Sequence, residues 1–106
     1  MVNATIGVLM KKPSLYPDDH VCFICKRPYV ELHHIYPSSR RPISDREGAT
    51  VFLCHEHHQG VFGVHGGDKS LDRWFKRDCQ RRWEQREGID DPEHKAFIAM
   101  FGVNYL

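Results

Sequence analysis

The sequence predicts a small α+β domain held together by a metal ion, and three observations support this prediction. The chain has 106 residues, the size of one small domain. It contains 8 histidines and 4 cysteines, an unusual number of metal ligands for its length. Strand-like patterns in the first half are followed by helical periodicity in the second half. We therefore expect one domain over residues 1–106, with an N-terminal arm (1–20), a metal-binding and hairpin region (21–66) and C-terminal helices (68–106).

Composition and charge exclude several classes of protein. The 15 lysines and arginines nearly balance the 14 acidic residues, so the chain is not a histone-like polycation. The apolar run from Ile6 to Met10 is too short for a signal core, and no segment approaches the ~20 apolar residues of a membrane span. We therefore expect an intracellular protein with no membrane segment, whose cysteines serve as metal ligands rather than in disulfides.

Local patterns predict the elements of the N-terminal half. A short strand is expected at residues 5–9, and an irregular arm follows it. Residues 29–36 are rich in β-branched and aromatic side chains and predict a strand, and residues 50–53 predict a second one. Between these strands, residues 37–42 have the turn residues of a loop, and the capping-box spacing of residues 44–47 predicts one helical turn.

The C-terminal half is expected to be helical. After a glycine-rich loop, a helix begins at Asp68 or Ser70 and ends at Gly88. A last short helix opens at Pro92 and ends before Gly102. The apolar residues of the longer helix follow the 3.6-residue period and are expected to face the core; they are Leu71, Trp74, Phe75, Cys79 and Trp83.

Two pairs of residues with the same spacing predict a structural zinc site. Cys22 and Cys25 are separated by two residues, and so are Cys54 and His57. Two such half-sites make the closed Cys₃His tetrahedron of a structural zinc, whose binding energy is largely folding energy in a small domain. The alternative is that these are buried free cysteines with surface histidines around them. Among the histidines that follow Cys54, His57 fits the spacing best.

A second group of histidines lies close to this site in the sequence: His33, His34, His55, His58 and His65. The two that are adjacent in the first predicted strand point to opposite faces, unless a distortion brings both imidazoles to a common site. A metal held by imidazoles, with one further imidazole left free as a base, makes a workable hydrolytic site. The alternative is that these histidines are polar surface residues or groups that only support the metal ligands from behind.

Two segments of the chain resemble the motif of the HNH nucleases. These segments are Glu-Leu-His-His-Ile at 31–35 and Val-Phe-Leu-Cys-His-Glu-His-His at 51–58, and the specific resemblance covers residues 21–65. Residues 63–65 and 101–106 look like those of small phage-encoded members and, more loosely, of phage recombination-enhancement nucleases. The resemblance implies a ββα-metal fold on a treble-clef zinc knuckle. It also implies a phage- or prophage-encoded, metal-dependent endonuclease that hydrolyses DNA phosphodiester bonds.

The resemblance also assigns roles to individual residues. His33 and His58 would bind the catalytic metal, with His65 completing the site, and His34 would be the general base. Imidazole ligands favour zinc as the second metal, and magnesium or manganese supported by substrate phosphate and water stays open. The chain departs from the family at one point, since the asparagine usually found before the second strand is replaced by Gly-Ala-Thr at 48–50.

Basic residues suggest where DNA would bind. Residues 69–86 carry seven lysines and arginines against three acidic residues, a balance of +4. Such side chains give salt-sensitive, sequence-independent phosphate contacts, although most basic helix faces are simply solvated. The candidate contacts are Arg40, Arg41, Lys69, Arg73, Lys76 and Arg77.

Two other functions remain open from the sequence. A non-catalytic zinc-binding module for DNA or a protein partner would use the same knuckle and would not need a free base at His34. A structural zinc fold, inactive without the asparagine, would bind one metal ion per chain rather than two. Four histidine and cysteine residues have no assigned role: His20, His55, His94 and Cys79.

Overall fold

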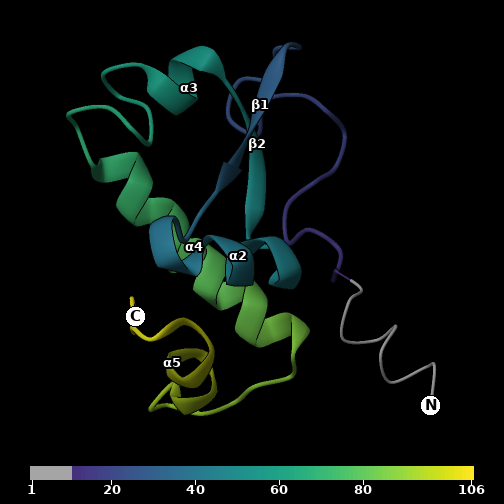
Figure 1. Cartoon of the computed structure of the whole chain (residues 1–106), viewed down its shortest axis with the longest axis vertical. Helices are drawn as coiled ribbons and strands as arrows, with labels where there is room; N and C mark the ends of the chain where they lie inside the picture. The colour runs from purple at the N-terminus through teal and green to yellow at the C-terminus, as the bar shows by residue number, and fades with distance from the viewer. Residues whose placement is uncertain (1–10) are drawn as a thin grey trace.

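The structure, a computed structural model, describes residues 11–106 and confirms the α+β class (Figure 1). The predicted strand at residues 5–9 lies outside the described residues. Within residues 11–106 there are one two-stranded sheet and four α-helices. The elements are β1 (Val30–His34), the 3₁₀ helix η1 (Ser38–Arg40), α2 (Arg41–Glu47), β2 (Thr50–Cys54), α3 (His55–Gln59), α4 (Ser70–Arg86) and α5 (Lys95–Phe101).

The two strands form the predicted hairpin. β1 and β2 pair antiparallel, with His33 opposite Val51 and His34 opposite Thr50. β1 is shorter than the predicted strand over 29–36 but has the same centre. β2 leads without a break into α3, so the residues of the second predicted half-site lie at a strand-to-helix junction.

The connection between the strands is more helical than predicted. Residues 37–42 were expected to be a loop, but they contain η1 and the first two residues of α2. The prediction was wrong because it took proline as a sign of a loop. Proline is tolerated in the first turn of a helix, where its missing N–H is not needed, and Pro42 lies in the first turn of α2. Gly48 ends α2 with a φ of 79°, the left-handed conformation that glycine adopts readily.

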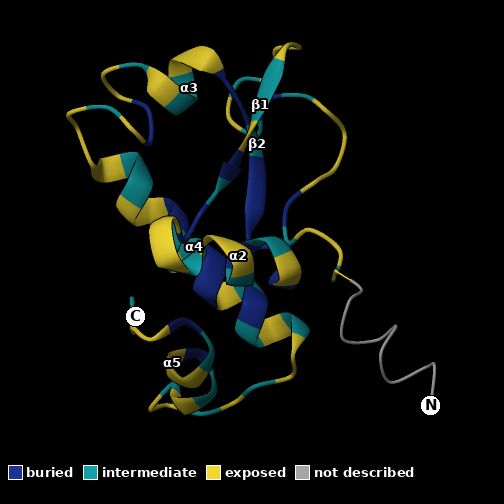
Figure 2. Ribbon diagram, in the orientation of Figure 1, coloured by how far each residue is buried: buried dark blue, intermediate teal, exposed yellow. Residues whose placement is uncertain are grey.

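α4 supplies most of the helical side of the core. Its side chains Phe75, Cys79 and Trp83 are buried, as the periodicity predicted. Figure 2 shows buried residues along β2 and through the middle of α4. Trp74 does not join them, because 46% of its surface is exposed. The prediction that Trp74 is a core residue is therefore wrong: at 100° per residue, the buried face is centred on Phe75 and Cys79, and Trp74 lies beyond its edge.

The C-terminal segment closes the core from below in Figure 1. α5 begins at Lys95 rather than at Pro92, since Asp91 accepts hydrogen bonds from the backbone N–H groups of Glu93 and Lys95 and holds the chain in a turn first. Its phenylalanines pack against Tyr36 and Trp83. No helix within residues 11–106 has both the length and the apolar character that crossing a membrane requires.

Candidate metal centres

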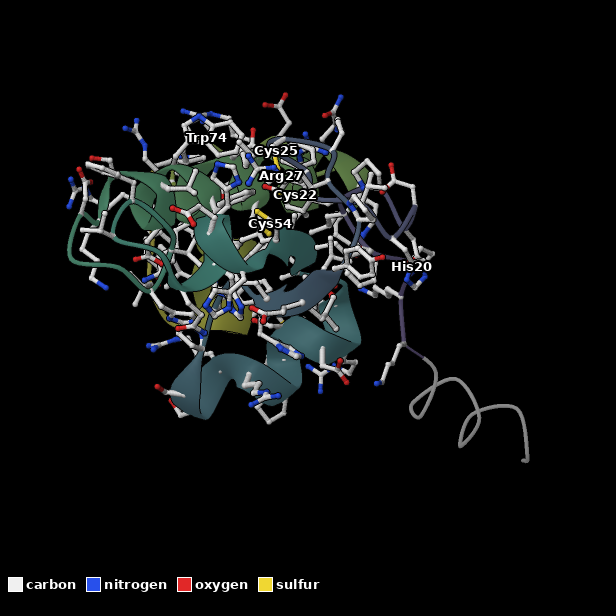
Figure 3. The ribbon with its side chains drawn as sticks, turned by 90° about the horizontal axis from the view of Figure 1, so that it is seen from above. His20, Cys22, Cys25, Arg27, Cys54 and Trp74 are labelled. Atoms are coloured by element: carbon white, nitrogen blue, oxygen red, sulfur yellow. The ribbon has the colours of Figure 1, made fainter. Side chains whose placement is uncertain are left out.

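The structure brings the four predicted knuckle ligands together. The Cys25 and Cys54 sulfurs are 3.7 Å apart, and His57 Nδ1 lies 3.5 Å from the Cys22 sulfur and 3.2 Å from the Cys54 sulfur. The labelled sulfurs of the three cysteines are grouped in Figure 3, where His20 lies well apart from them. The four ligand atoms lie within 4.8 Å of one another, and this cluster could bind a metal such as zinc.

These spacings match the edges of a zinc tetrahedron. With Zn–S bonds of about 2.3 Å and Zn–N bonds of about 2.0–2.1 Å, tetrahedral ligands are separated by about 3.8 Å between sulfurs and about 3.6 Å between sulfur and nitrogen. The observed 3.7 Å between sulfurs and 3.2–3.5 Å between sulfur and nitrogen agree with these values. These three separations are those expected of ligands that share one tetrahedral metal ion.

The backbone of the knuckle favours thiolate at one of the cysteines. Burial raises the pKa of the Cys22 thiol, but hydrogen bonds from backbone groups of Cys25, Cys54 and Ile24 outweigh it and lower that pKa to about 6. Burial raises the pKa of the neighbouring Cys54. Because only the thiolate binds metal, a thiol with a lowered pKa assists ligation at neutral pH.

A second cluster is formed by three histidines from three different segments. His33 comes from β1, His58 from α3 and His65 from the loop that follows α3, and one nitrogen of each lies within 4.8 Å of the others. Their ring centroids are 4.8–5.2 Å apart. The three predicted histidines therefore meet, although up to 32 residues separate them in the chain.

His33 provides the strongest indication that this cluster takes a ligand. Its side chain is only 3% exposed, and its Nε2 atom has no hydrogen-bond partner within residues 11–106. Burial lowers the pKa of His33 to about 3, with His58 and His65 adding to the effect, so the ring is neutral at pH 7. A buried polar atom without a partner is costly, and a neutral imidazole is the form that binds metal.

Close backbone packing holds His65 beside α3. The His65 N–H donates to the carbonyl of His58 at 2.9 Å. Glycines permit this approach, since a Cβ on Gly63 would lie 2.7 Å from the carbonyl oxygens of Glu56 and His57. The glycine-rich loop is therefore folded tightly against α3, and it delivers the third imidazole.

His34 follows His33 in β1, and although alternation in a regular strand directs neighbouring side chains to opposite faces, both histidines line one cavity. This cavity has a volume of about 230 Å³ and is also lined by His58, His65 and Arg41. His34 Nε2 is 3.4 Å from an oxygen of Asp45 on α2. The carboxylate is positioned to orient the ring, and the pKa of Asp45 is held low, first by its hydrogen bond from Lys11 and then by His34.

Two carboxylates of this region were not found from the sequence. Glu31 accepts a hydrogen bond from His58 Nδ1 at 2.7 Å and lies 3.3 Å from His55 Nδ1, contacts that lower its pKa. The sequence did hold a signal that Glu31 lies near the histidines. Residues two apart in a strand share a face, and Glu31 precedes His33 by two residues. No sequence signal pointed to Asp45, which is 11 residues from His34 and reaches it through the fold of α2.

The basic residues predicted to contact nucleic acid do not form one surface. Arg41 is exposed at the cavity beside His34, whereas the Arg40 guanidinium donates to the carbonyl of Phe101 and fastens the C-terminal segment. Lys76 pairs with Asp72 at 3.0 Å, and both Lys76 and Lys69 contribute to a lowered pKa of His65, whose main cause is burial. The remaining two, Arg73 and Arg77, line a different hollow on the outer face of α4.

Comparisons with known proteins give no further assignment. No protein-family model, curated protein or solved structure matches the chain.

Proposed function

We propose that the protein is a metal-dependent endonuclease that hydrolyses DNA phosphodiester bonds, built as an HNH-type ββα-metal domain on a treble-clef zinc knuckle. One observation carries the proposal: buried His33, whose Nε2 has no hydrogen-bond partner within residues 11–106, belongs to the three-histidine cluster and lines the same cavity as His34 and Arg41. This cavity combines candidate metal ligands, a base and a phosphate-binding side chain, which are the components of metal-assisted phosphodiester hydrolysis.

The two clusters have separate tasks in this proposal. The Cys22, Cys25, Cys54 and His57 cluster binds structural zinc and fixes the junction between β2 and α3. His33, His58 and His65 hold a second divalent metal, which supplies Lewis-acid stabilisation of the phosphate and its leaving oxygen when bound. Zinc suits the imidazole ligands best, with magnesium or manganese as the other candidates.

His34 is the general base. A hydrogen bond from its Nε2–H to Asp45 leaves Nδ1 with a free lone pair, which takes a proton from the attacking water. Asp45 thereby does part of the orienting work that the family's missing asparagine would do. Arg41 lines the same cavity and is positioned to neutralise a phosphate there.

Plasmid cleavage with purified protein, supplied in turn with zinc, magnesium and manganese, tests this proposal. We expect cleavage by the wild type, a loss of about 10²–10⁴-fold in the His34→Ala variant, and unchanged zinc content in that variant. The exposed His20 lies outside both clusters, so His20→Ala is the matched control and should cleave normally.

The metal content separates the proposal from its rivals. Two metal ions per chain with cleavage support the nuclease. One metal ion per chain and no cleavage with any metal would establish a structural or binding zinc module instead. Equal cleavage by wild type and His34→Ala would refute the assignment of the base.

A further inference from the structure

A row of arginines on α4 differs from the other basic residues of that helix. Lys76, Arg82 and Arg86 each pair with a carboxylate at 2.7–3.0 Å. In contrast, Arg73, Arg77 and Arg81 are exposed, and in the described part of the chain none has a carboxylate partner within 4.0 Å. Three unneutralised guanidinium groups are notable in a chain whose net charge is only +1.

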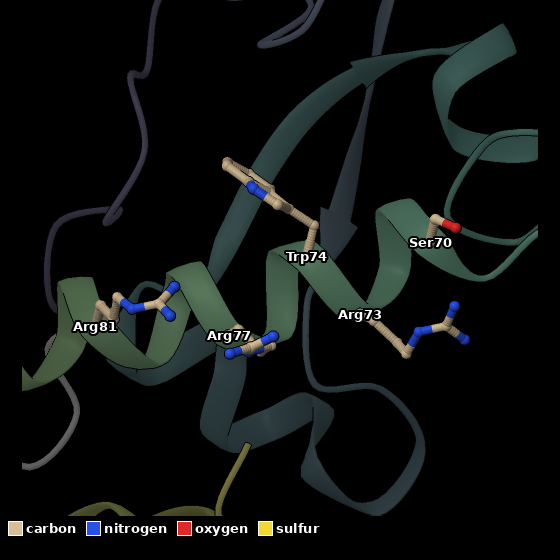
Figure 4. A pocket seen from close by; sticks show the side chains of 5 residues that line it. All are labelled: Ser70, Arg73, Trp74, Arg77 and Arg81. Carbon is tan, nitrogen blue, oxygen red and sulfur yellow. The ribbon is translucent and has the colours of Figure 1, made fainter. Parts of the chain in front are cut away.

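These arginines are arranged in line. They follow each other at intervals of four residues, so each lies about 6 Å further along the helix axis than the last. Together with Ser70 and Trp74 they line a shallow hollow of about 440 Å³, and Figure 4 shows the side chains arranged along this outer face of α4. The row therefore offers regularly spaced positive charge over about 12 Å, the length of roughly three or four nucleotides of one strand.

Trp74 forms the boundary between this arginine hollow and an apolar one. The second hollow, of about 420 Å³, is lined by Trp74, Leu71, Ile24 and Phe62 among others. Trp74 is 46% exposed, so an aromatic ring is open to solvent beside the arginine row, and Phe62 in the apolar hollow is 72% exposed. Asp68, at the rim, is engaged by the backbone N–H of Ser70.

We propose that the arginine hollow and Trp74 form a binding site for single-stranded nucleic acid, in which phosphates contact Arg73, Arg77 and Arg81 and a base stacks on Trp74. Positive charge that follows a backbone, combined with exposed aromatic rings, is the chemistry by which single strands are bound without sequence preference. A duplex offers phosphates but keeps its bases stacked inside, so it would leave Trp74 and Phe62 unused. The partner that uses both the charges and the rings is therefore a strand with unpaired bases.

This site is distinct from the cleavage site. The arginine hollow shares no lining residue with the histidine cavity. The inference rests on the proposed function only in taking nucleic acid as the ligand, and it does not require the cleavage chemistry. It can therefore be tested on the catalytically disabled His34→Ala protein, where failure of binding and failure of cleavage are separate results.

The test is fluorescence anisotropy of a labelled oligothymidylate with zinc-loaded His34→Ala protein over a range of salt concentrations. We expect Arg73→Gln with Arg77→Gln to weaken binding and to reduce the salt slope by about 1.4, at about 0.7 for each lost phosphate contact. A double variant Arg46→Gln with Lys95→Gln removes the same charge from exposed positions on α2 and α5, and it should keep the wild-type slope.

Variants at Trp74 test base stacking separately from charge. Trp74→Ala should weaken binding about tenfold, whereas Trp74→Phe retains a ring and most of the affinity. Bound oligonucleotide should quench the fluorescence of exposed Trp74, and the quenching should vanish in Trp74→Phe, which retains only buried Trp83.

Four results would overturn the inference. These are no binding of oligothymidylate, equal or tighter binding of a duplex, a Trp74→Ala variant with unchanged affinity, and equally tight binding of heparin with the same dependence on Trp74. The last result would indicate a general polyanion site.

Discussion

The two metal-ligand clusters of this protein lie close together in the chain but differ in construction. The Cys₃His cluster offers four ligand atoms, the number that fills a tetrahedral zinc site, so a zinc ion bound by all four would have no position left for a substrate. The three-histidine cluster offers three ligand atoms, lines a cavity and includes a buried nitrogen that has no partner among residues 11–106. A closed donor set suits a structural metal, and an open one leaves positions for water and phosphate.

The groups that surround the two sets of side chains also differ. The cysteines are supported mainly by backbone groups and by burial. The histidines are supported by side-chain carboxylates, with Glu31 on His58 and Asp45 beside His34. Backbone support serves stability, whereas carboxylate support sets imidazole tautomers and orientation, which matters for chemistry.

The largest expected effect comes from removing a ligand of the closed cluster. Cys25 is the least buried of its three cysteines, so Cys25→Ser changes ligation more than packing. Structural zinc contributes about 10–16 kcal/mol in small zinc-binding folds, comparable with the whole stability of a domain, about 5–15 kcal/mol. We expect Cys25→Ser to be largely unfolded by circular dichroism and to bind no structural zinc.

The matched change in the open cluster is His58→Ala. It should remain folded, because the hydrogen bond that it loses is to the solvent-exposed carboxylate of Glu31, and should keep one zinc ion per chain while losing cleavage. If His58→Ala unfolds as completely as Cys25→Ser, the two clusters do not have separate tasks.

The next effect concerns the carboxylate that holds His58. Glu31→Ala should weaken binding of the second metal by about 10–100-fold, because His58 loses the partner that fixes its tautomer. Isothermal titration of protein already loaded with one zinc ion measures this. Glu31→Gln, which keeps an acceptor, should lose less, and Glu56→Ala on the exposed side of α3 should lose nothing. Unchanged affinity in Glu31→Ala would remove Glu31 from the site.

Asp45 provides a smaller effect, on rate rather than on metal binding. Asp45→Ala should lower kcat about tenfold with KM unchanged, because His34 loses its orienting contact while substrate binding is retained. The control is Lys11→Ala, which removes only the other partner of Asp45. A rate for Asp45→Ala equal to that of the wild type would show that His34 is oriented by other groups.

The smallest effect is a pH dependence of stability in protein that holds only the structural zinc. Burial lowers the pKa of His33 to about 3 in the folded state, against the ordinary 6.5, so protons bind preferentially to the unfolded chain as the pH falls below 6.5. Stability is therefore complete above this range, and about 1 kcal/mol is lost between pH 7 and pH 5.5.

Denaturant unfolding of the wild type and of His33→Gln at pH 7 and pH 5.5 measures this loss of stability. Glutamine does not titrate, so the variant should lose about 1 kcal/mol less than the wild type over the same interval. Parallel pH dependences in the two proteins would contradict the neutral, buried state of His33.

Spacing in the sequence predicted much of the structure. The repeated two-residue gaps of Cys22/Cys25 and Cys54/His57 specify a geometry by themselves, because a tight turn and a strand-to-helix junction each direct two neighbouring side chains to one point. The strands and α4 were also predictable, since alternation and the 3.6-residue period are local properties. The helical start of α2 and the exposure of Trp74 were not, because proline composition and apolar character do not reveal which face a neighbouring element covers.

The α+β class, the hairpin, the long helix and the four residues of the Cys₃His cluster could therefore be predicted from sequence patterns. Packing brought Glu31 to His58 and Asp45 to His34, and among residues 11–106 it left Arg73, Arg77 and Arg81 without the carboxylate partners that other basic residues of α4 have. Distance along the chain accounts for this difference. Local geometry follows from neighbouring residues, whereas the partner of a side chain depends on which remote segment the packed core brings beside it.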